Sequence, residues 1–262
     1  MAEFISENLS GSRFEDVYLT GTRFHDIDLR DARFSLVDLT GITIRGALVA
    51  DAEISGEVLS LRVNGVDVAP LVEAELDRRY PDRAAMRPAD AAGYRDAWNR
   101  LERLWQPTVQ RARGLDPELL HRQVDGEWSF IETLRHLVFA TDAWVRRAVL
   151  GDPSPWDPLD LPHEEMTDRP GVPRDRAARP TLEEVLALRA DRMATVREVL
   201  AGLTDEQLNG VTEPVLEPGY PEPESFPVHR CLGAVINEEW EHRLYAERDF
   251  DALEARPAEA GR

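Results

Sequence analysis

The first sixty residues repeat a large apolar side chain at every fifth position. The series consists of Phe4, Leu9, Phe14, Leu19, Phe24, Leu29, Phe34, Leu39, Ile44, Val49, Ile54 and Leu59. Mostly small or β-branched residues stand two positions before each of these, and Asp, Arg, Gly, Ser and Thr dominate between them. A period of five fits neither an α-helix nor a flat strand. It predicts a chain that turns a corner every five residues and places one large side chain inside each time.

Four such sides make a coil of twenty residues, so the stretch from residue 4 to about 60 predicts about three coils. Backbone hydrogen bonds are expected to join neighbouring coils at the spacing of strands in a sheet. The repeat resembles the pentapeptide-repeat family. This resemblance implies a right-handed quadrilateral β-helix over residues 1–68.

A solenoid leaves open ends that need caps. Asn64-Gly65 lies between two short apolar runs, which is a strong hairpin signal. Pro70 then stands early in a helical pattern, where its missing N–H costs nothing. We therefore expect a capping helix and linker over residues 69–84.

From Asp90 onward, apolar residues recur at steps of three and four, which predicts helices. The predicted helices span residues 90–112, 129–150, 181–201 and 228–253. Proline-rich stretches at 151–180 and 211–227 predict two long loops. Four long helices with two long connections predict an all-α four-helix bundle over 85–255. A disordered tail is expected at 256–262.

Local signals mark the helix ends. Ser129 with Glu132, and Thr181 with Glu184, have the spacing of a capping box. Pro107 is expected to kink or interrupt the first helix of the bundle. The chain is thus predicted to be a multidomain protein with a β-helix followed by a helical bundle.

Composition excludes several classes of function. The 50 acidic residues outnumber the 31 basic ones, giving a net charge of −19, which argues against nucleic-acid and anionic-membrane binding. All the basic residues are Arg, so lysine chemistry is excluded. A single cysteine, Cys231, excludes an intrachain disulfide and a thiolate-rich metal site. We expect a cytoplasmic protein, since the N-terminus has no signal-peptide pattern.

The last predicted helix carries polar groups in line with its apolar seam. The seam reads Val228, Cys231, Val235, Glu238, His242, Tyr245 and Asp249. Glu238 and His242 should therefore point inward, one turn apart on the same face. Burying a carboxylate is costly unless it is paired or binds a metal, so this spacing suits two ligands of one divalent ion. Tyr245 and Asp249 are expected to be core and supporting groups, and Cys231 a small buried apolar residue.

A third ligand must come from another helix. Of the six histidines, His136 and His242 are the two that lie within long predicted helices, and small neighbours leave room around His136. Two histidines and a carboxylate match a catalytic zinc site with an open position. The same set also suits nickel or iron. Trp156, in the first long loop, is a candidate pocket lid.

Two stretches resemble the DinB-like (YfiT-like) superfamily. They are W-S-x-x-E-x-L-x-H-L at 128–137 and N-E-E-W-E-H-R-L-Y-A-E-R-D at 237–249. The resemblance covers about residues 85–255 and implies a metal-binding four-helix bundle, commonly dimeric, with His136, Glu238 and His242 as ligands. The family often has His where this chain has Glu238. The His/Glu/His version is similar to mycothiol-dependent isomerases, which implies a mycothiol-like cosubstrate.

Two functions follow as hypotheses. The first is a metal-dependent enzyme that activates water or a low-molecular-weight thiol for transfer, isomerisation or hydrolysis on a small molecule. The alternative is a non-catalytic protein with a structural metal, in which the repeat domain mediates protein binding or dimerisation. Some pentapeptide-repeat proteins imitate DNA, but residues 1–66 hold eleven acidic residues against six Arg. The resulting excess of negative charge on three coils is too small to imitate the phosphates of DNA, so we do not favour that role.

Overall fold

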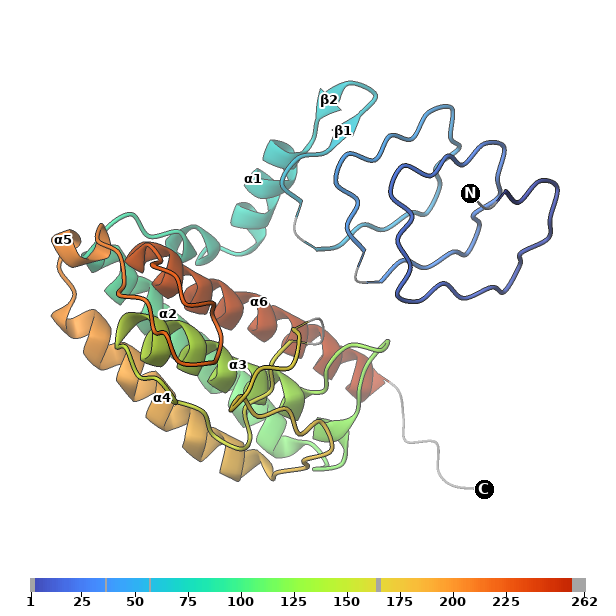
Figure 1. The fold of residues 1–262 in the computed structure, drawn as a ribbon. Helices are drawn as coiled ribbons and strands as arrows, with labels where there is room; N and C mark the ends of the chain where they lie inside the picture. The colour runs from blue at the N-terminus through green and yellow to red at the C-terminus, as the bar shows by residue number, and fades with distance from the viewer. Residues whose placement is uncertain (1–2, 36, 57, 164–165, 256–262) are drawn as a thin grey trace. The chain divides into compact units, whose positions relative to one another are not determined.

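The computed structural model describes residues 3–35, 37–56, 58–163 and 166–255 (Figure 1). The chain divides into two compact units, residues 1–56 and 57–262. The predicted disordered tail, 256–262, lies outside the described residues. Within the described ranges, no helix is both long and apolar enough to cross a bilayer.

The first unit turns a corner every five residues, as the repeat predicts. The residues in the left-handed region, with φ of 50–126°, are Ser6, Gly11, Asp16, Gly21, Asp26, Asp31, Gly41, Gly46, Asp51 and Gly56. Glycine adopts this conformation without steric cost, and Asp is among the few other residues that tolerate it. At every second corner a backbone hydrogen bond closes the turn, first between Ser12 N and Leu9 O at 3.0 Å and then at each tenth residue up to Ile42.

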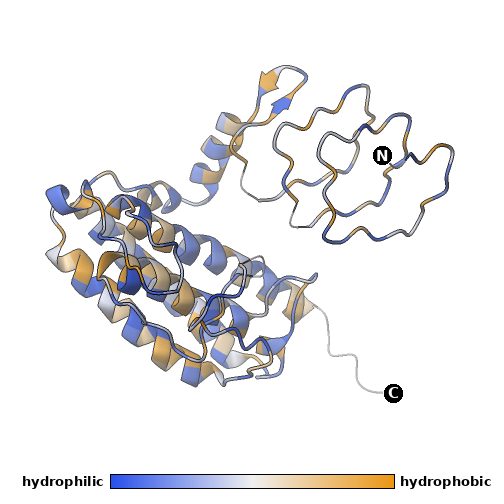
Figure 2. Ribbon diagram, viewed as in Figure 1, coloured by the Kyte–Doolittle hydropathy of each residue, from blue (hydrophilic) through white to orange (hydrophobic). Residues whose placement is uncertain are grey.

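Between these corners the structure shows no clear β-helix. Residues 3–35 and 37–56 contain no strand, and the backbone hydrogen bonds described above each close a turn. The large side chains of the five-residue series, expected inside, are 44–84% exposed. Figure 2 shows apolar and polar residues following one another at short intervals along this trace. A corner needs only one residue that tolerates the left-handed conformation. A β-helix also needs backbone hydrogen bonds between residues a whole coil apart, and these must overcome the entropy lost when each coil closes.

The second unit begins with a hairpin and a short helix. Strands β1 (Arg62–Val63) and β2 (Val66–Asp67) pair antiparallel. Asn64 and Gly65, with φ of 50° and 84°, form the two-residue turn that the sequence predicts. Helix α1 (Ala69–Arg79) follows with Pro70 in its first turn, and the 3₁₀ turn η1 spans Arg83–Met86.

Four long helical segments form the bundle (Figure 1). They are α2 (Ala91–Gly114), α3 (Phe130–Thr141) continued by the π-helix η3 (Asp142–Val149), α4 (Leu182–Gly202) and α6 (Val228–Ala255). The short elements are η2 (Leu119–His121) and α5 (Asp205–Leu208). Helix α3 packs against α4 and α6, and α2 packs against the same two helices. Facing apolar seams therefore enclose a common interior.

The caps lie where the sequence places them. Ser129 and Glu132 form a complete capping box at the start of α3, and Thr181 and Glu184 form another at the start of α4. Of the two effects expected of Pro107, an interruption of the first helix is wrong, because α2 runs through it to Gly114. A kink at Pro107 stays a prediction. A proline removes one backbone donor, and the packed face of a 24-residue helix offsets that loss.

The bundle interior is dense and largely apolar. Its largest fully buried apolar side chains are Trp98, Leu101, Ile131, Leu134, Leu137, Phe139, Leu161, Leu232, Ile236 and Phe250. Two arginines, Arg135 and Arg147, are buried just as completely. These cations bring polar chemistry into the interior next to the seam that carries the candidate ligands.

Candidate metal site

Helix α6 holds Glu238 and His242 one turn apart on the side that faces α3. Nδ1 of His242 lies 3.0 Å from the backbone oxygen of Glu238 and 3.2 Å from its Oε2 atom. A carbonyl oxygen can only accept, so the backbone contact places a proton on Nδ1 of His242. Nε2 of His242 is then the unprotonated nitrogen that is available to a metal.

Helix α3 brings His136 to the same point. The capping box fixes where α3 begins, and nearly every residue of the helix is buried. Nε2 of His136 lies 3.3 Å from Oε2 of Glu238. The rings of His136 and His242 are stacked, with centroids 5.0 Å apart. The structure thus brings together the three residues that the sequence singles out from two helices, and their role as ligands remains a prediction.

The spacing of these three side chains fits a divalent ion. Each offers one ligand atom, and these atoms all lie within 4.8 Å of one another. Two ligand atoms on a tetrahedral zinc ion are separated by about 3.3 Å when each bond is about 2.0 Å long. The contact between His136 and Glu238 has this length. The donor set of two imidazoles and one carboxylate suits zinc and the other borderline ions.

A backbone carbonyl completes the environment of His136. Nδ1 of His136 lies 3.0 Å from the carbonyl oxygen of Leu161, and the contact is buried. Nδ1 must donate there, which leaves Nε2 turned toward Glu238 as the nitrogen that a metal would bind. Leu161 could not be identified from the sequence, because its backbone carbonyl is a group that every residue has.

Aromatic rings pack around the two imidazoles. The Trp128 ring lies 4.5 Å from that of His136 and 6.0 Å from that of His242, measured between centroids. Phe139 lies 6.1 Å from His136, and Tyr245 lies 5.8 Å from His242. Apolar walls of this kind lower the local dielectric and strengthen the interaction of the ligands with a cation.

Trp156, the candidate lid residue, lies one ring further from the site. It stacks on Phe139 with centroids 5.7 Å apart. Tyr220, from the second long loop, also packs against Phe139, with ring centroids 5.8 Å apart. The two long loops therefore meet at an aromatic cluster that adjoins His136.

The electrostatics keep Glu238 and His242 in the states that a metal requires. Burial tends to raise the pKa of Glu238, but the hydrogen bond from His136 and the nearby imidazoles lower it overall. Burial, followed by the proximity of His136, lowers the pKa of His242 to about 4. Glu238 is therefore an anion and His242 a neutral imidazole at neutral pH.

The other singled-out residues lie outside the ligand set. Cys231 is fully buried, and burial raises its pKa to about 11, so its thiol stays protonated at neutral pH. Asp249 bonds to Arg248 and belongs to an ion pair. Glu239, next to Glu238, points elsewhere and pairs with Arg189 at 2.6 Å through both of its oxygens.

Comparison with known families agrees with this geometry. A model of the DinB superfamily matches residues 100–246, a stretch that contains all three candidate ligands. A model of pentapeptide repeats matches residues 8–46 in eight copies. A search of the curated proteins finds no match.

Proposed function

The chain belongs to the DinB superfamily, and from this premise we propose that it is a metal-dependent enzyme acting on a small molecule. His136, Glu238 and His242 hold the divalent ion, which activates water or a low-molecular-weight thiol for transfer, isomerisation or hydrolysis. The observation that carries this proposal is the convergence of the three ligand atoms within 4.8 Å. An ion bound there would act as a Lewis acid and would bring the pKa of a bound water or thiol close to neutrality.

The protein's own residues prepare this site. The His136 side chain is 7% exposed and that of His242 16%, whereas that of Glu238 is 33% exposed. A small molecule therefore reaches the ligands on the side of Glu238. The anionic Glu238 and the neutral His242 need no proton rearrangement before they ligate a cation at neutral pH.

The thiol version of the proposal is supported by the likeness to mycothiol-dependent isomerases. It is tested with cobalt-loaded protein, whose visible spectrum reports the coordination sphere. Titration with mycothiol should produce a sulfur-to-cobalt absorption band, and the His242→Ala variant should produce none. An unchanged spectrum with mycothiol would remove the thiol version and leave activation of water.

A chelator separates the catalytic proposal from a structural metal. The bundle has a large apolar interior that does not depend on the three ligands. Protein stripped of metal should therefore keep its helical circular dichroism and regain its cobalt spectrum when the ion is restored. Complete loss of helical signal on chelation would support a structural metal instead.

We propose further that the first unit forms a quadrilateral β-helix, with backbone hydrogen bonds between neighbouring coils. The support is the corner at every fifth residue and the eight matched repeats. Hydrogen exchange on the full chain tests this, because paired coils protect backbone amides. Protection of amides between residues 14 and 44 is expected, and exchange at the rate of an unfolded chain would contradict the β-helix.

A further inference from the structure

The first long loop is fastened to the bundle by its backbone carbonyls. We call residues 153–161 the strap. Four strap carbonyls accept hydrogen bonds from buried or half-buried side chains of α3, η3 and α4: those of Pro153, Pro155, Leu159 and Leu161. The donors are four arginines, Arg135, Arg146, Arg147 and Arg192, and the imidazole of His136. A proline-rich segment lacks many backbone donors, so its carbonyls are free to be bound from the helices.

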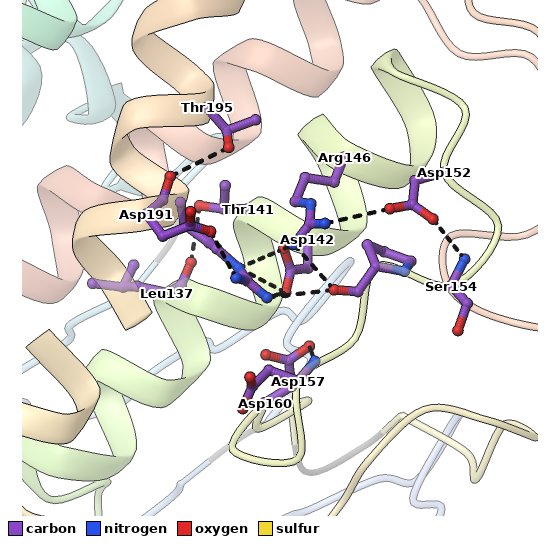
Figure 3. Close-up of polar contacts among 12 residues, drawn as sticks. Leu137, Thr141, Asp142, Arg146, Asp152, Ser154, Asp157, Asp160, Asp191 and Thr195 are labelled. Atoms are coloured by element: carbon purple, nitrogen blue, oxygen red, sulfur yellow. Dashed lines mark hydrogen bonds and ion pairs between the residues drawn. The ribbon is translucent and has the colours of Figure 1, made fainter. Parts of the chain in front are cut away.

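An ion-pair network holds the middle of the strap (Figure 3). The buried carboxylate of Asp142 receives Nε and Nη2 of Arg192 at 2.9 Å. Arg192 and Arg146 both donate to the carbonyl of Pro155, at 3.4 Å and 3.3 Å. At one end of the strap, Arg147 donates to the carbonyl of Pro153 at 2.7 Å.

The other end of the strap reaches the candidate metal site through two consecutive residues of α3. Nε of Arg135 donates to the carbonyl of Leu159 at 2.8 Å. Nδ1 of His136 contacts the carbonyl of Leu161, two residues further along, at 3.0 Å. The guanidinium and the imidazole thus bind the same short piece of backbone, and displacement of one carbonyl displaces the other.

Arg135 is fully buried, and its guanidinium donates hydrogen bonds to three backbone carbonyls. Besides Leu159, it reaches Asp175 O at 2.6 Å and Ala178 O at 3.3 Å, near the end of the same loop. A buried cation is costly unless its hydrogen bonds are satisfied. A planar fork of donors can hold three separate carbonyls at once, which a lysine ammonium on its flexible stem cannot do in the same geometry.

We infer that Arg135 is a positioning residue of the metal site. By fixing the carbonyl of Leu159 it holds that of Leu161 on Nδ1 of His136, which sets the imidazole tautomer and presents Nε2 to the ion. This inference rests on the proposed function for the identity of the ligand. The tautomer of His136 can be measured in the metal-free chain, so the role of Arg135 and the proposed function can fail separately.

The first test needs no variant. In metal-free, full-length protein labelled with ¹⁵N, long-range proton–nitrogen spectra report which nitrogen of each imidazole carries the proton. His136 should carry a proton on Nδ1 at neutral pH. The opposite tautomer, or rapid exchange between both, would overturn the inference. A fixed Nδ1–H tautomer in a protein that binds no metal would overturn the proposed function alone.

The second test compares two matched arginines. Arg147 is as buried as Arg135 and also donates to three carbonyls, those of Pro153, Val215 and Glu217, but it lies at the far end of the strap. Arg135→Lys should weaken cobalt binding about 10- to 100-fold, the usual cost of losing a group that orients a metal ligand, and should alter the cobalt spectrum.

Arg147→Lys is the control for general destabilisation. It should lower the unfolding midpoint by an amount similar to Arg135→Lys while its cobalt affinity stays within about twofold of the unmodified chain. Equal loss of affinity in both variants would overturn the inference. So would an Arg135→Lys protein that binds cobalt as the unmodified chain does.

Discussion

Adjacent glutamates on α6 have opposite surroundings. Glu238 lies among two imidazoles and is partly exposed, whereas Glu239 is buried with Arg189. The guanidinium of Arg189 also stacks over the Trp105 ring at 4.5 Å. Consecutive helical residues point about a quarter of a turn apart, so one carboxylate joins the site and the next joins the core.

This contrast predicts that the two glutamates differ in what their loss does. Glu239→Ala should lower the free energy of unfolding by about 3–5 kcal/mol, because it leaves the buried charge of Arg189 unpaired. It should leave metal binding intact. Glu238→Ala should abolish tight metal binding at a much smaller cost in stability. Urea unfolding and metal analysis of both variants check this pair, and metal loss in the Glu239 variant would contradict it.

Asp160 gives the strap a dependence on pH. Its side chain is fully buried, its Oδ1 atom has no hydrogen-bond partner, and Oδ2 contacts the backbone N–H of Asp157 at 3.4 Å. Burial and the charge of Asp142 raise the pKa of Asp160 well above its ordinary value. The folded state therefore binds a proton that the unfolded state releases, and stability falls as pH rises from about 4 through the folded pKa.

Asp160→Asn should remove this part of the pH dependence. The amide has the same shape and cannot ionise, so the variant should be more stable than the unmodified chain in mildly alkaline solution and lose that advantage near pH 4. Urea unfolding midpoints across this range provide the measurement. Parallel pH profiles for the two proteins would contradict the assignment.

At the scale of elements, helix starts were predictable because their signals are local. The boxes formed by Ser129 with Glu132 and by Thr181 with Glu184 each satisfy backbone donors within four residues of sequence. The π-helix from Asp142 to Val149 was not predictable in this way. Its side chains contact α4 and the strap, and such long-range partners leave no periodic pattern in the sequence.

The capping box of α3 is expected to stabilise the fold without affecting metal binding. Ser129→Ala should lower the free energy of unfolding by about 1 kcal/mol, since it removes the hydroxyl that accepts from the backbone of Glu132. Because His136 lies two turns into the helix, cobalt affinity should change little. Thermal unfolding and a cobalt titration check the two parts, and a variant as stable as the unmodified chain would contradict the capping role.

In the molecule as a whole, the sequence predicts both the repeat and the bundle, but in different detail. The bundle and its three converging side chains could be predicted because seam position and helix periodicity fix which residues face inward. The carbonyl of Leu161 and the Arg135 clamp could not, because they depend on the path of an irregular loop. In the first unit the corners follow the five-residue repeat, whereas residues 3–35 and 37–56 contain no strand.

The metal content of the full-length protein after zinc loading and desalting decides whether His136, Glu238 and His242 bind an ion. We expect about one zinc ion per chain, as a three-residue site requires. The His242→Ala variant should retain its helical circular dichroism and lose that ion. An unmodified chain that holds no more zinc than this variant would contradict the proposed metal site.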